Sequence, residues 1–216
     1  MTATVLNSNI IKLKEAVKKI LPKTISYVER KPYNNMVATL SDAILQAGMN
    51  YKTVVMPRIS DILYRYSNFT STCDFIILFQ TVPIEQIIKW KNKKKQNTLC
   101  NLAWLLYNEG VNSEEDFRQW GRVSENEEKL LALDGIGYKT VDYLKLLSGL
   151  ETIPIDRHLF KFLKDSEIPI TTYYDASYIF KSVAKELNIE ERLLDKIIWD
   201  YMSSSNECLS ANHSTH

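Results

Sequence analysis

Hydrophobic residues recur at helical spacing along almost the whole chain. The first such stripe lies within residues 7–21, where Asn7 or Ser8 is a candidate N-cap. The same spacing recurs at about 36–47, 51–66, 70–79, 83–91, 94–108, 114–120, 124–132, 138–148, 157–164, 174–187 and 190–202. No segment alternates like a strand, and no repeat of fixed period is present. The pattern predicts an all-α protein.

Composition supports this prediction. The chain has 216 residues, of which 45% are hydrophobic, and a chain of this kind buries a core rather than staying disordered. It contains only 6 glycines, fewer than sheets and nucleotide-binding α/β folds normally use at their turns. The net charge of +1 excludes a uniformly basic protein but allows a local basic face.

Several functional classes find no support in the sequence. Cys73, Cys100 and Cys208 are odd in number and form no C-x-x-C pair, which argues against a disulfide framework and against a zinc or iron–sulfur site. The first residues lack the features of a signal peptide, and no apolar run is long enough for a membrane span. We therefore expect an intracellular protein, cytoplasmic or associated with the nucleoid. The polar tail after Ser203 is expected to be flexible.

The most informative stretch runs from Ser124 to Leu163. Ser124 and Glu127 form a potential capping box that begins a helix, and Gly135 and Gly137 bracket a tight turn before a second helix. A glycine-lined turn at a helix start presents backbone N–H groups at the positive end of the helix dipole, which suits a phosphate. The alternative is a plain helical hairpin whose glycines only permit the turn.

The sequence of this stretch resembles a known family. L-x-x-L-D-G-I-G-Y-K-T, followed by I-P-I-D-R-H-L-F-K-F-L, is similar to the helix–hairpin–helix (HhH-GPD) DNA glycosylase superfamily. That family has L-P-G-V-G-x-K-T and then a catalytic aspartate in V-D-x-H. Lys139 and Asp156 stand at closely similar spacing, whereas Asp134 replaces the usual proline.

Upstream segments extend the resemblance to about residues 36–165. Asn92 to Lys95 precede an apolar helix as in the family, and the stretch from Ile44 resembles the helix and loop that carry a polar plug residue. The G-I-G-Y-K and I-D-R-H forms resemble the compact 8-oxoguanine branch. The four-cysteine iron–sulfur motif of the endonuclease III branch is absent from the sequence.

The resemblance implies a two-lobed helical bundle with a catalytic cleft between the lobes. We expect residues 1–35 to form an N-terminal helix that packs with the C-terminal lobe. Residues 36–150 are expected to form a central domain that ends in the helix–hairpin–helix, 124–148. Residues 151–202 complete the second lobe, and residues 203–216 form the flexible tail.

Removal of a base from DNA, the reaction that the resemblance implies, requires chemistry that Asp156 and Lys139 can supply. Loss of a base builds positive charge on the sugar C1′, which the Asp156 carboxylate would stabilise. A neutral Lys139 amine would attack C1′ and form a Schiff base, and β-elimination would then nick the strand. As an N-cap, Asp156 would accept backbone N–H bonds and stay ionised. Taken singly, each residue has a plainer explanation, as a solvated lysine and a simple cap.

Other residues are candidates for binding DNA and a displaced base. The predicted DNA contacts are Gly135, Ile136, Gly137, Tyr138, Lys93, Lys94, Lys95 and Arg157, although the lysines also fit a solvated helix end. By resemblance alone, Gln46 and Asn50 are plug or base-pocket candidates. His158 is expected to have a structural role. The candidates for stacking on a base, which the sequence does not rank, are Tyr33, Tyr51, Trp104, Tyr138 and Trp199.

The resemblance predicts a DNA glycosylase with AP-lyase activity in base excision repair, acting as a monomer on double-stranded DNA with an oxidised purine such as 8-oxoguanine. Glycosylases for alkylated bases or oxidised pyrimidines, a non-catalytic hairpin module and a helical interaction protein remain open. No cofactor is expected beyond an optional monovalent cation. Its ligands would be the backbone carbonyls of Leu131, Leu133 and Ile136.

Overall fold

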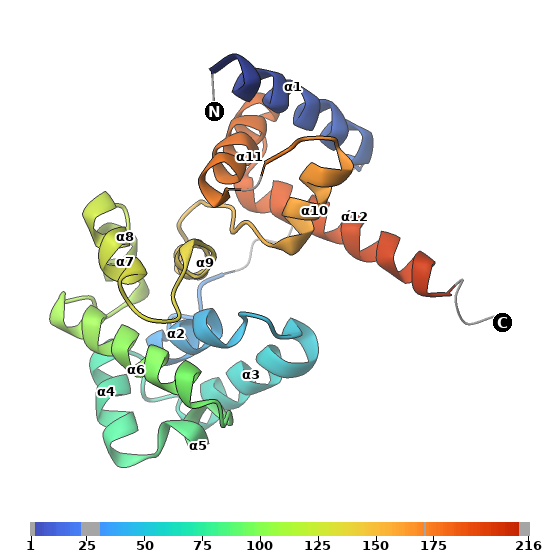
Figure 1. Cartoon of the computed structure of the whole chain (residues 1–216). Helices are drawn as coiled ribbons and strands as arrows, with labels where there is room; N and C mark the ends of the chain where they lie inside the picture. The colour runs from blue at the N-terminus through green and yellow to red at the C-terminus, as the bar shows by residue number, and fades with distance from the viewer. Residues whose placement is uncertain (1–2, 23–30, 171, 212–216) are drawn as a thin grey trace. The chain divides into compact units, whose positions relative to one another are not determined.

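The protein folds into helices around two separate hydrophobic cores. The computed structural model describes residues 3–22, 31–170 and 172–211, and within these ranges it contains helices and no β-strand (Figure 1). The all-α prediction is therefore confirmed. Contacts divide the chain into one unit of Met1–Glu29 with Glu151–His216 and another of Arg30–Leu150. Each unit buries its own core.

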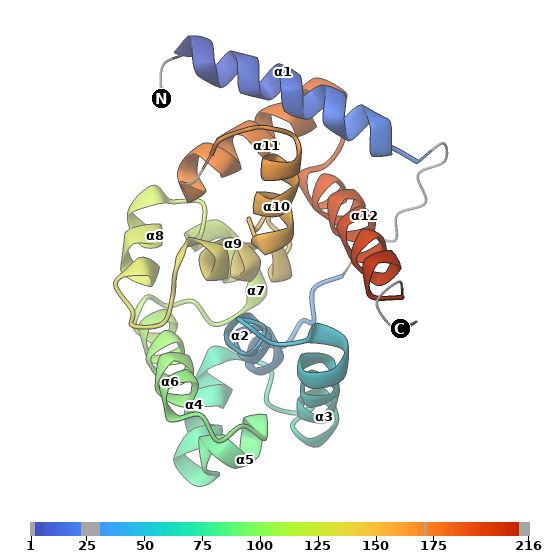
Figure 2. The same ribbon diagram turned by 45° about the vertical axis from the view of Figure 1, so that its right-hand side comes forward.

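The unit of Arg30–Leu150 is built around one helix, α2 (Met36–Leu45). Every residue of α2 is buried, as expected of a helix that is apolar on nearly all sides. It packs against α3, α4, α6 and α9, and Figure 2 shows it surrounded by these elements. The elements of this unit after α2 are η1 (Tyr51–Val55, a π-helix), α3 (Met56–Arg65), α4 (Thr72–Thr81), α5 (Ile84–Ile88), α6 (Lys93–Asn108), α7 (Glu114–Trp120), α8 (Ser124–Leu131) and α9 (Tyr138–Leu147).

The other unit joins the two ends of the chain. Its helices are α1 (Ala3–Ile20), α10 (Arg157–Asp165), α11 (Tyr173–Leu187) and α12 (Glu191–Ala211). α1 packs along α11 and also contacts α12, while α10 packs against α12. These contacts bury Leu13 and Val17 from α1 with Phe180 and Ile198 from the C-terminal helices.

The helices that extend furthest beyond their predicted ends are α1 and α12. α1 begins at Ala3, so the predicted caps Asn7 and Ser8 lie inside it. The predicted tail starts within α12, which continues to Ala211, and residues 212–216 lie outside the described residues. In both cases polar residues that resemble caps or loops continue a helix that has already started, because propagating a helix is easier than starting one.

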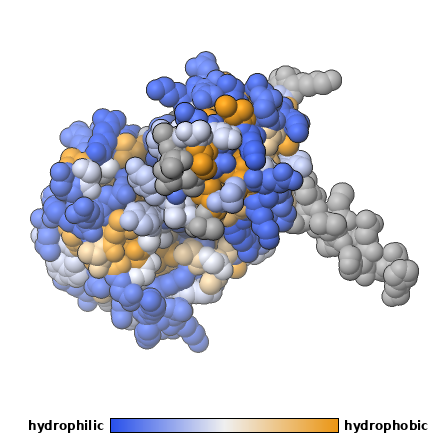
Figure 3. Space-filling view, turned by 45° about the horizontal axis from the view of Figure 1, so that its top comes forward, coloured by the Kyte–Doolittle hydropathy of each residue, from blue (hydrophilic) through white to orange (hydrophobic). Residues whose placement is uncertain are grey.

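On the face drawn in Figure 3, hydrophilic residues predominate and hydrophobic residues gather in limited patches. In the described part of the chain, no helix combines the length and the apolar character that crossing a membrane requires.

Candidate functional site

The glycine turn between α8 and α9 forms a tight helical hairpin. Hydrogen bonds from Leu133 N to Leu130 O and from Ile136 N to Leu133 O, each 3.1 Å, fold the turn. Gly135 has φ +85°, a left-handed conformation that favours glycine, whereas Gly137 is extended. Gly137 is the N-cap of α9, and no side chain caps this helix among the described residues. The first turn of α9 therefore presents its backbone donors without a competing side chain.

The predicted capping box of α8 is not formed. Val123, rather than Ser124, is the N-cap, and it provides no side-chain hydrogen bond. The Ser124 hydroxyl donates to Glu125 at 3.0 Å, and Glu127 forms an ion pair with Lys145 of α9. Glu127 thus ties the two hairpin helices together, because the pairing with Lys145 replaces the local bond that the motif predicts.

Two residues of α6 contact the hairpin turn at Asp134. The hydroxyl oxygen of Thr98 lies 2.8 Å from the carbonyl oxygen of Asp134. A Cβ added at Gly135 would approach that hydroxyl to 2.6 Å, so the turn and Thr98 fit closely. The Lys94 ammonium forms a 3.1 Å ion pair with the exposed Asp134 carboxylate. Lys94 therefore lies beside the hairpin, but a carboxylate partly offsets its charge.

Lys139 lies in the first turn of α9 and points toward the end of α2. Its Nζ donates a hydrogen bond of 3.3 Å to Oε1 of Gln46, the residue that caps α2. One turn further along both helices, the Tyr143 hydroxyl donates to Oδ1 of Asp42 at 3.3 Å. The two helices therefore run in opposite directions where they touch, and two polar contacts one turn apart fix their register.

A buried carboxylate lies at the centre of this packing. Asp42 is 0% exposed, and besides Tyr143 it accepts hydrogen bonds from the hydroxyls of Tyr33 at 2.7 Å and Tyr51 at 3.4 Å. A buried carboxylate needs such donors because burial removes its hydration. Tyr33 and Tyr51, named from the sequence as stacking candidates, are thus engaged with Asp42.

The Lys95 side chain, from α6, caps the C-terminal end of α2 rather than facing solvent. Its ammonium donates to the carbonyl oxygens of Ile44 at 3.1 Å, Leu45 at 2.8 Å and Ala47 at 2.7 Å. All three of its donor hydrogens are used in this way. Burial lowers the pKa of Lys95 from its ordinary value. This amine satisfies the last carbonyls of a buried helix, and its contact with DNA stays an untested prediction.

The other lysines of the run remain at the surface. Lys93 lies 3.5 Å from the Glu85 carboxylate, and Lys94 pairs with Asp134 as described above. Both side chains are mostly exposed, and they stand in the first turn of α6, which begins after the N-cap Asn92. Of the three adjacent lysines, Lys93 and Lys94 are thus the two whose side chains remain mostly exposed to solvent.

Asn50, predicted as a plug residue, has a local structural role. Its side chain accepts a hydrogen bond of 3.0 Å from Thr53 N and caps the π-helix η1. Gln46, the other plug candidate, contacts Lys139 instead. The structure brings together Gln46, Lys139 and the hairpin within one unit. The Asn50 side chain instead caps η1, the element that follows it in the chain.

Asp156 belongs to the other unit and caps α10. Its Oδ1 accepts hydrogen bonds from His158 N at 2.7 Å and Leu159 N at 3.1 Å. This confirms the expectation that Asp156 accepts backbone bonds at a helix start. No partner of its Oδ2 is found within the described ranges, so one carboxylate oxygen is left for another group.

The segment before Asp156 is firmly anchored. Ile153 and Ile155 are buried in the core of their unit, and Ile155 N donates to the Tyr173 hydroxyl at 3.1 Å. Glu151, at the start of the segment, accepts two hydrogen bonds of 3.1 Å from Arg192 of α12. These contacts fix the direction from which the chain enters α10, and hence the position of the carboxylate.

Aromatic packing follows Asp156 directly. The His158 ring meets Trp199 of α12 edge to face, with ring centroids 6.0 Å apart. This contact gives His158 a packing role within its own unit. Arg157 is exposed at the start of α10, as a residue that contacts phosphate would be. Trp199 is 40% exposed and Tyr138, after the hairpin, is 53% exposed, so both keep surface for a ligand.

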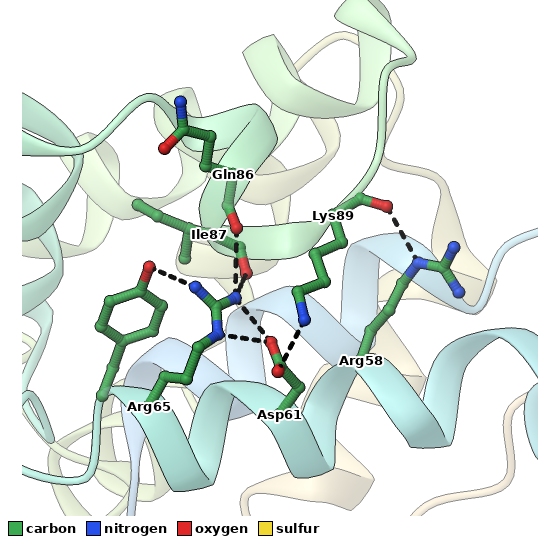
Figure 4. A network of polar contacts seen from close by, with 7 residues as sticks. Arg58, Asp61, Arg65, Gln86, Ile87 and Lys89 are labelled. Atoms are coloured by element: carbon green, nitrogen blue, oxygen red, sulfur yellow. Dashed lines mark hydrogen bonds and ion pairs between the residues drawn. The ribbon is translucent and has the colours of Figure 1, made fainter.

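A polar network joins α3 to the end of α5 (Figure 4). Asp61 pairs with Arg65 at 2.5 Å and with Lys89 at 2.7 Å, and the Arg65 guanidinium donates to the carbonyls of Gln86 and Ile87 at 3.1 Å. Burial raises the pKa of Asp61, but the bonds from Arg65 and Lys89 outweigh it and leave the pKa lowered. Lys89 therefore supports the fold and is partly neutralised.

Two cavities lie away from the contact between Gln46 and Lys139. They have volumes of about 400 and 610 Å³ and are lined by residues around Glu85 and around Lys164. No cluster of three or more His, Cys, Asp or Glu side chains suited to a metal is present in the described chain. Of the carbonyls predicted to hold a monovalent cation, that of Leu133 accepts from Ile136 N and keeps a second lone pair. The cation remains a prediction.

Sequence reasoning missed two residues of this site. Thr98 carries no signal, because a threonine in a helix commonly bonds its own backbone, and this one also lies 2.9 Å from Lys94 O. Asp42 did carry a signal, since it is the one acid in the apolar run MVATLSDAIL. An acid in a helix buried on all sides indicates a hydrogen-bonded polar centre.

The fold and the site define an all-α protein with a glycine-turn helical hairpin and a lysine in its first turn. The chain belongs to the family described as "Domain of unknown function (DUF8548)", whose model matches residues 11–203. No curated protein matches it. Among solved structures, the crystal structure of the Methanocaldococcus jannaschii 8-oxoguanine DNA glycosylase is similar, with 19% identity, a TM-score of 0.48, and coverage of 91% of this chain and 85% of that chain.

Proposed function

We propose that this protein is a DNA glycosylase with AP-lyase activity that removes a damaged base and nicks the strand through Lys139. The single observation that carries the proposal is the placement of Lys139 after the glycine hairpin, partly buried, with its amine held by Gln46. The exposed Lys93 also meets a glutamine oxygen, that of Gln96 in its own helix, whereas Lys139 is partly buried and its partner comes from a separate helix. An amine held beside an uncapped helix start can meet a sugar whose phosphate binds that start.

The neutral Lys139 amine bonds to C1′ while the bond from C1′ to the base breaks, and the base leaves with the electron pair and gains a proton. Opening of the sugar at its ring oxygen, which becomes a hydroxyl, gives an imine between Nζ and C1′. Loss of a C2′ proton then expels the 3′ phosphate, and water releases the amine. The unpartnered Oδ2 of Asp156 supports a role in stabilising positive charge at C1′.

DNA binding is assigned to the hairpin and the exposed lysines beside it. Backbone donors of Gly137 and Tyr138 would hold a phosphate, and Lys93 and Lys94 would add charge. Arg157 would add a further phosphate contact. An oxidised purine such as 8-oxoguanine is the first substrate to test, and oxidised pyrimidines and alkylated bases are the next.

Covalent trapping tests the proposal. The protein is mixed with a duplex that contains one abasic site, in the presence of borohydride, which reduces an imine to a stable amine. The wild type should give a protein–DNA complex that survives denaturing electrophoresis, and Lys139→Gln should not. Lys185→Gln, which changes an exposed lysine of α11, is the matched control and should trap like the wild type.

Each outcome has a clear meaning. Nicking or trapping that persists in Lys139→Gln would assign the nucleophile to another amine and overturn the role of Lys139. Binding without trapping would indicate a non-catalytic hairpin module. A set of duplexes that each carry one defined lesion then identifies the base that is released.

A further inference from the structure

The Gln46 amide is in an unusual position for a side chain with only a structural role. Its oxygen accepts from Lys139 Nζ at 3.3 Å. Its nitrogen, Nε2, is buried and has no hydrogen-bond partner within the described chain. A buried donor without a partner lowers stability, because it loses its hydration and gains nothing in return. An apolar side chain of the same length would avoid this penalty, so stability alone does not explain a glutamine here.

The hydrogen bond also fixes which way the amide points. A protonated lysine amine has only donors, so the amide nitrogen cannot face it in that form, before the amine loses the proton that attack requires. Rotating the amide would place two donors against each other and remove the only side-chain partner shown for this group. The orientation with Oε1 toward Lys139 and Nε2 toward the interior is therefore the favourable one.

The end of α2 holds Gln46 in place. Gln46 N donates to Asp42 O at 3.0 Å, and Met49 N donates to Gln46 O at 3.1 Å. Lys95 binds the carbonyls on both sides of Gln46, those of Leu45 and Ala47. The backbone of Gln46 is thus restrained on both sides, and its side chain has little freedom to move away from Lys139.

The position of α9 is fixed equally well. The Tyr143 hydroxyl donates to the buried carboxylate of Asp42, one turn from the contact between Gln46 and Lys139. Because the two contacts are one turn apart on both helices, sliding or rotation of α9 against α2 would break them together. The contact between Gln46 and Lys139 is therefore part of a fixed packing arrangement.

We propose that Gln46 is a positioning residue that holds the Lys139 amine in place for attack on the sugar carbon C1′. The inference rests on the proposed function, and it assigns Gln46 to the amine rather than to the base. By accepting one N–H of the amine, the amide oxygen limits the directions in which the nitrogen lone pair can point. Restricting a nucleophile to the reactive geometry raises its rate, and a displacement of about 1 Å can lower it about 10²-fold.

Two variants separate positioning from structure. Gln46→Met keeps the length of the side chain, removes the acceptor and removes the unpartnered donor. We expect its melting temperature to equal or exceed that of the wild type, while its rate of trapping on abasic-site DNA falls about ten-fold or more. A purely structural glutamine predicts the opposite pattern, a lower melting temperature and an unchanged rate per folded molecule.

Gln46→Glu keeps the acceptor and adds a charge. A carboxylate beside the amine favours the ammonium form, so trapping should require a higher pH but approach the wild-type rate once the amine is neutral. The titratable groups that hydrogen bonds place around this contact include Asp42 on α2, with Tyr33, Tyr51 and Tyr143 bonded to it, and Lys95 on α6. They are identical in all variants, so a difference between the pH profiles is due to position 46.

The measurement is the single-turnover rate of trapping by cyanoborohydride on one abasic-site duplex, at several pH values up to about 10, where lysine amines lose their proton. Slow trapping by Gln46→Met with recovery by Gln46→Glu at high pH supports the proposal. Wild-type rates in Gln46→Met overturn the positioning role and leave the proposed function intact. Failure of the wild type to trap overturns both.

Discussion

The amine of Lys139 lies 3.3 Å from the amide oxygen of Gln46, although the two residues are 93 positions apart in the chain. The contact joins the first turn of the second hairpin helix to the end of the most buried helix of its unit. A lysine at this position is restrained by a neighbour that is itself restrained. This relationship underlies both the proposed nucleophile and the positioning role of Gln46.

The two hairpin glycines should respond differently to alanine. Gly135→Ala places a Cβ at φ +85° and 2.6 Å from the Thr98 hydroxyl, and it should destabilise the protein by about 1–3 kcal/mol. Gly137→Ala meets no atom within 4 Å, so stability should change by less than about 1 kcal/mol. Its Cβ should nevertheless obstruct a phosphate and weaken duplex binding about ten-fold.

Chemical denaturation and fluorescence anisotropy at fixed salt measure these two effects. If Gly137→Ala binds duplex DNA as tightly as the wild type, the hairpin does not hold a phosphate at this point.

Asp156→Asn should separate capping from catalysis. Asparagine caps helices about as well as aspartate, so the melting temperature should barely change. Base release should fall about 10²-fold or more, because the charge opposite the developing cation is lost. Asp156→Ala is the companion variant, and it should lose activity and about 1 kcal/mol of stability together. Full activity in the folded asparagine variant would reduce Asp156 to a cap.

Removal of the Asp134 carboxylate should strengthen DNA binding. Asp134 is exposed on the hairpin and pairs with Lys94, so Asp134→Asn removes a negative charge from the proposed phosphate site and frees a positive one. We expect affinity to rise several-fold and the salt dependence to steepen by about 0.9 in log–log slope if Lys94 gains one phosphate. Stability should hardly change, since exposed ion pairs contribute about 0–1 kcal/mol.

Glu128→Gln, at an exposed acid of α8, is the control for net charge. Equal gains in the two variants would indicate a general charge effect rather than a site at the hairpin.

Acid should weaken the contact between α3 and α5. Bonds from Arg65 and Lys89 lower the pKa of Asp61 in the folded protein below its ordinary value of 3.8. Asp61 therefore stabilises the fold above that pH, and the contribution is lost as pH falls through the folded value. In acid titrations followed by circular dichroism, Asp61→Asn should be less stable at neutral pH and should lose this part of the pH dependence. An identical acid transition in both proteins would contradict this assignment.

The sequence correctly predicted those parts of the site whose structure depends on residues close together in the chain. Helical spacing predicted an all-α chain, the glycine pair predicted the turn before Lys139, and the position of Asp156 before an apolar helix predicted its capping bonds. The sequence was less reliable where one motif is compatible with two different sets of contacts. Ser124 and Glu127 match a capping box, yet Glu127 pairs with Lys145 because the folded hairpin brings a stronger partner close.

The sequence could not distinguish the roles of the three adjacent lysines at the start of α6. Lys93, Lys94 and Lys95 are adjacent and chemically equal, but successive residues of a helix point in different directions. Lys95 alone meets the carbonyl end of α2, about 50 positions earlier in the chain. Nothing in the run itself indicates which lysine will be taken up in this way.

By itself, the sequence determined the helices, the glycine turn at 135–137 and the cap at Asp156, since these depend on φ, ψ and hydrogen bonds among residues a few positions apart. The tertiary structure alone decided that Gln46 holds Lys139, that Lys95 ends α2 and that Asp42 gathers three tyrosine hydroxyls. These contacts arise when separate helices pack into one core. Polar groups that packing buries must find partners wherever the fold places them, at distances along the chain that local patterns do not record.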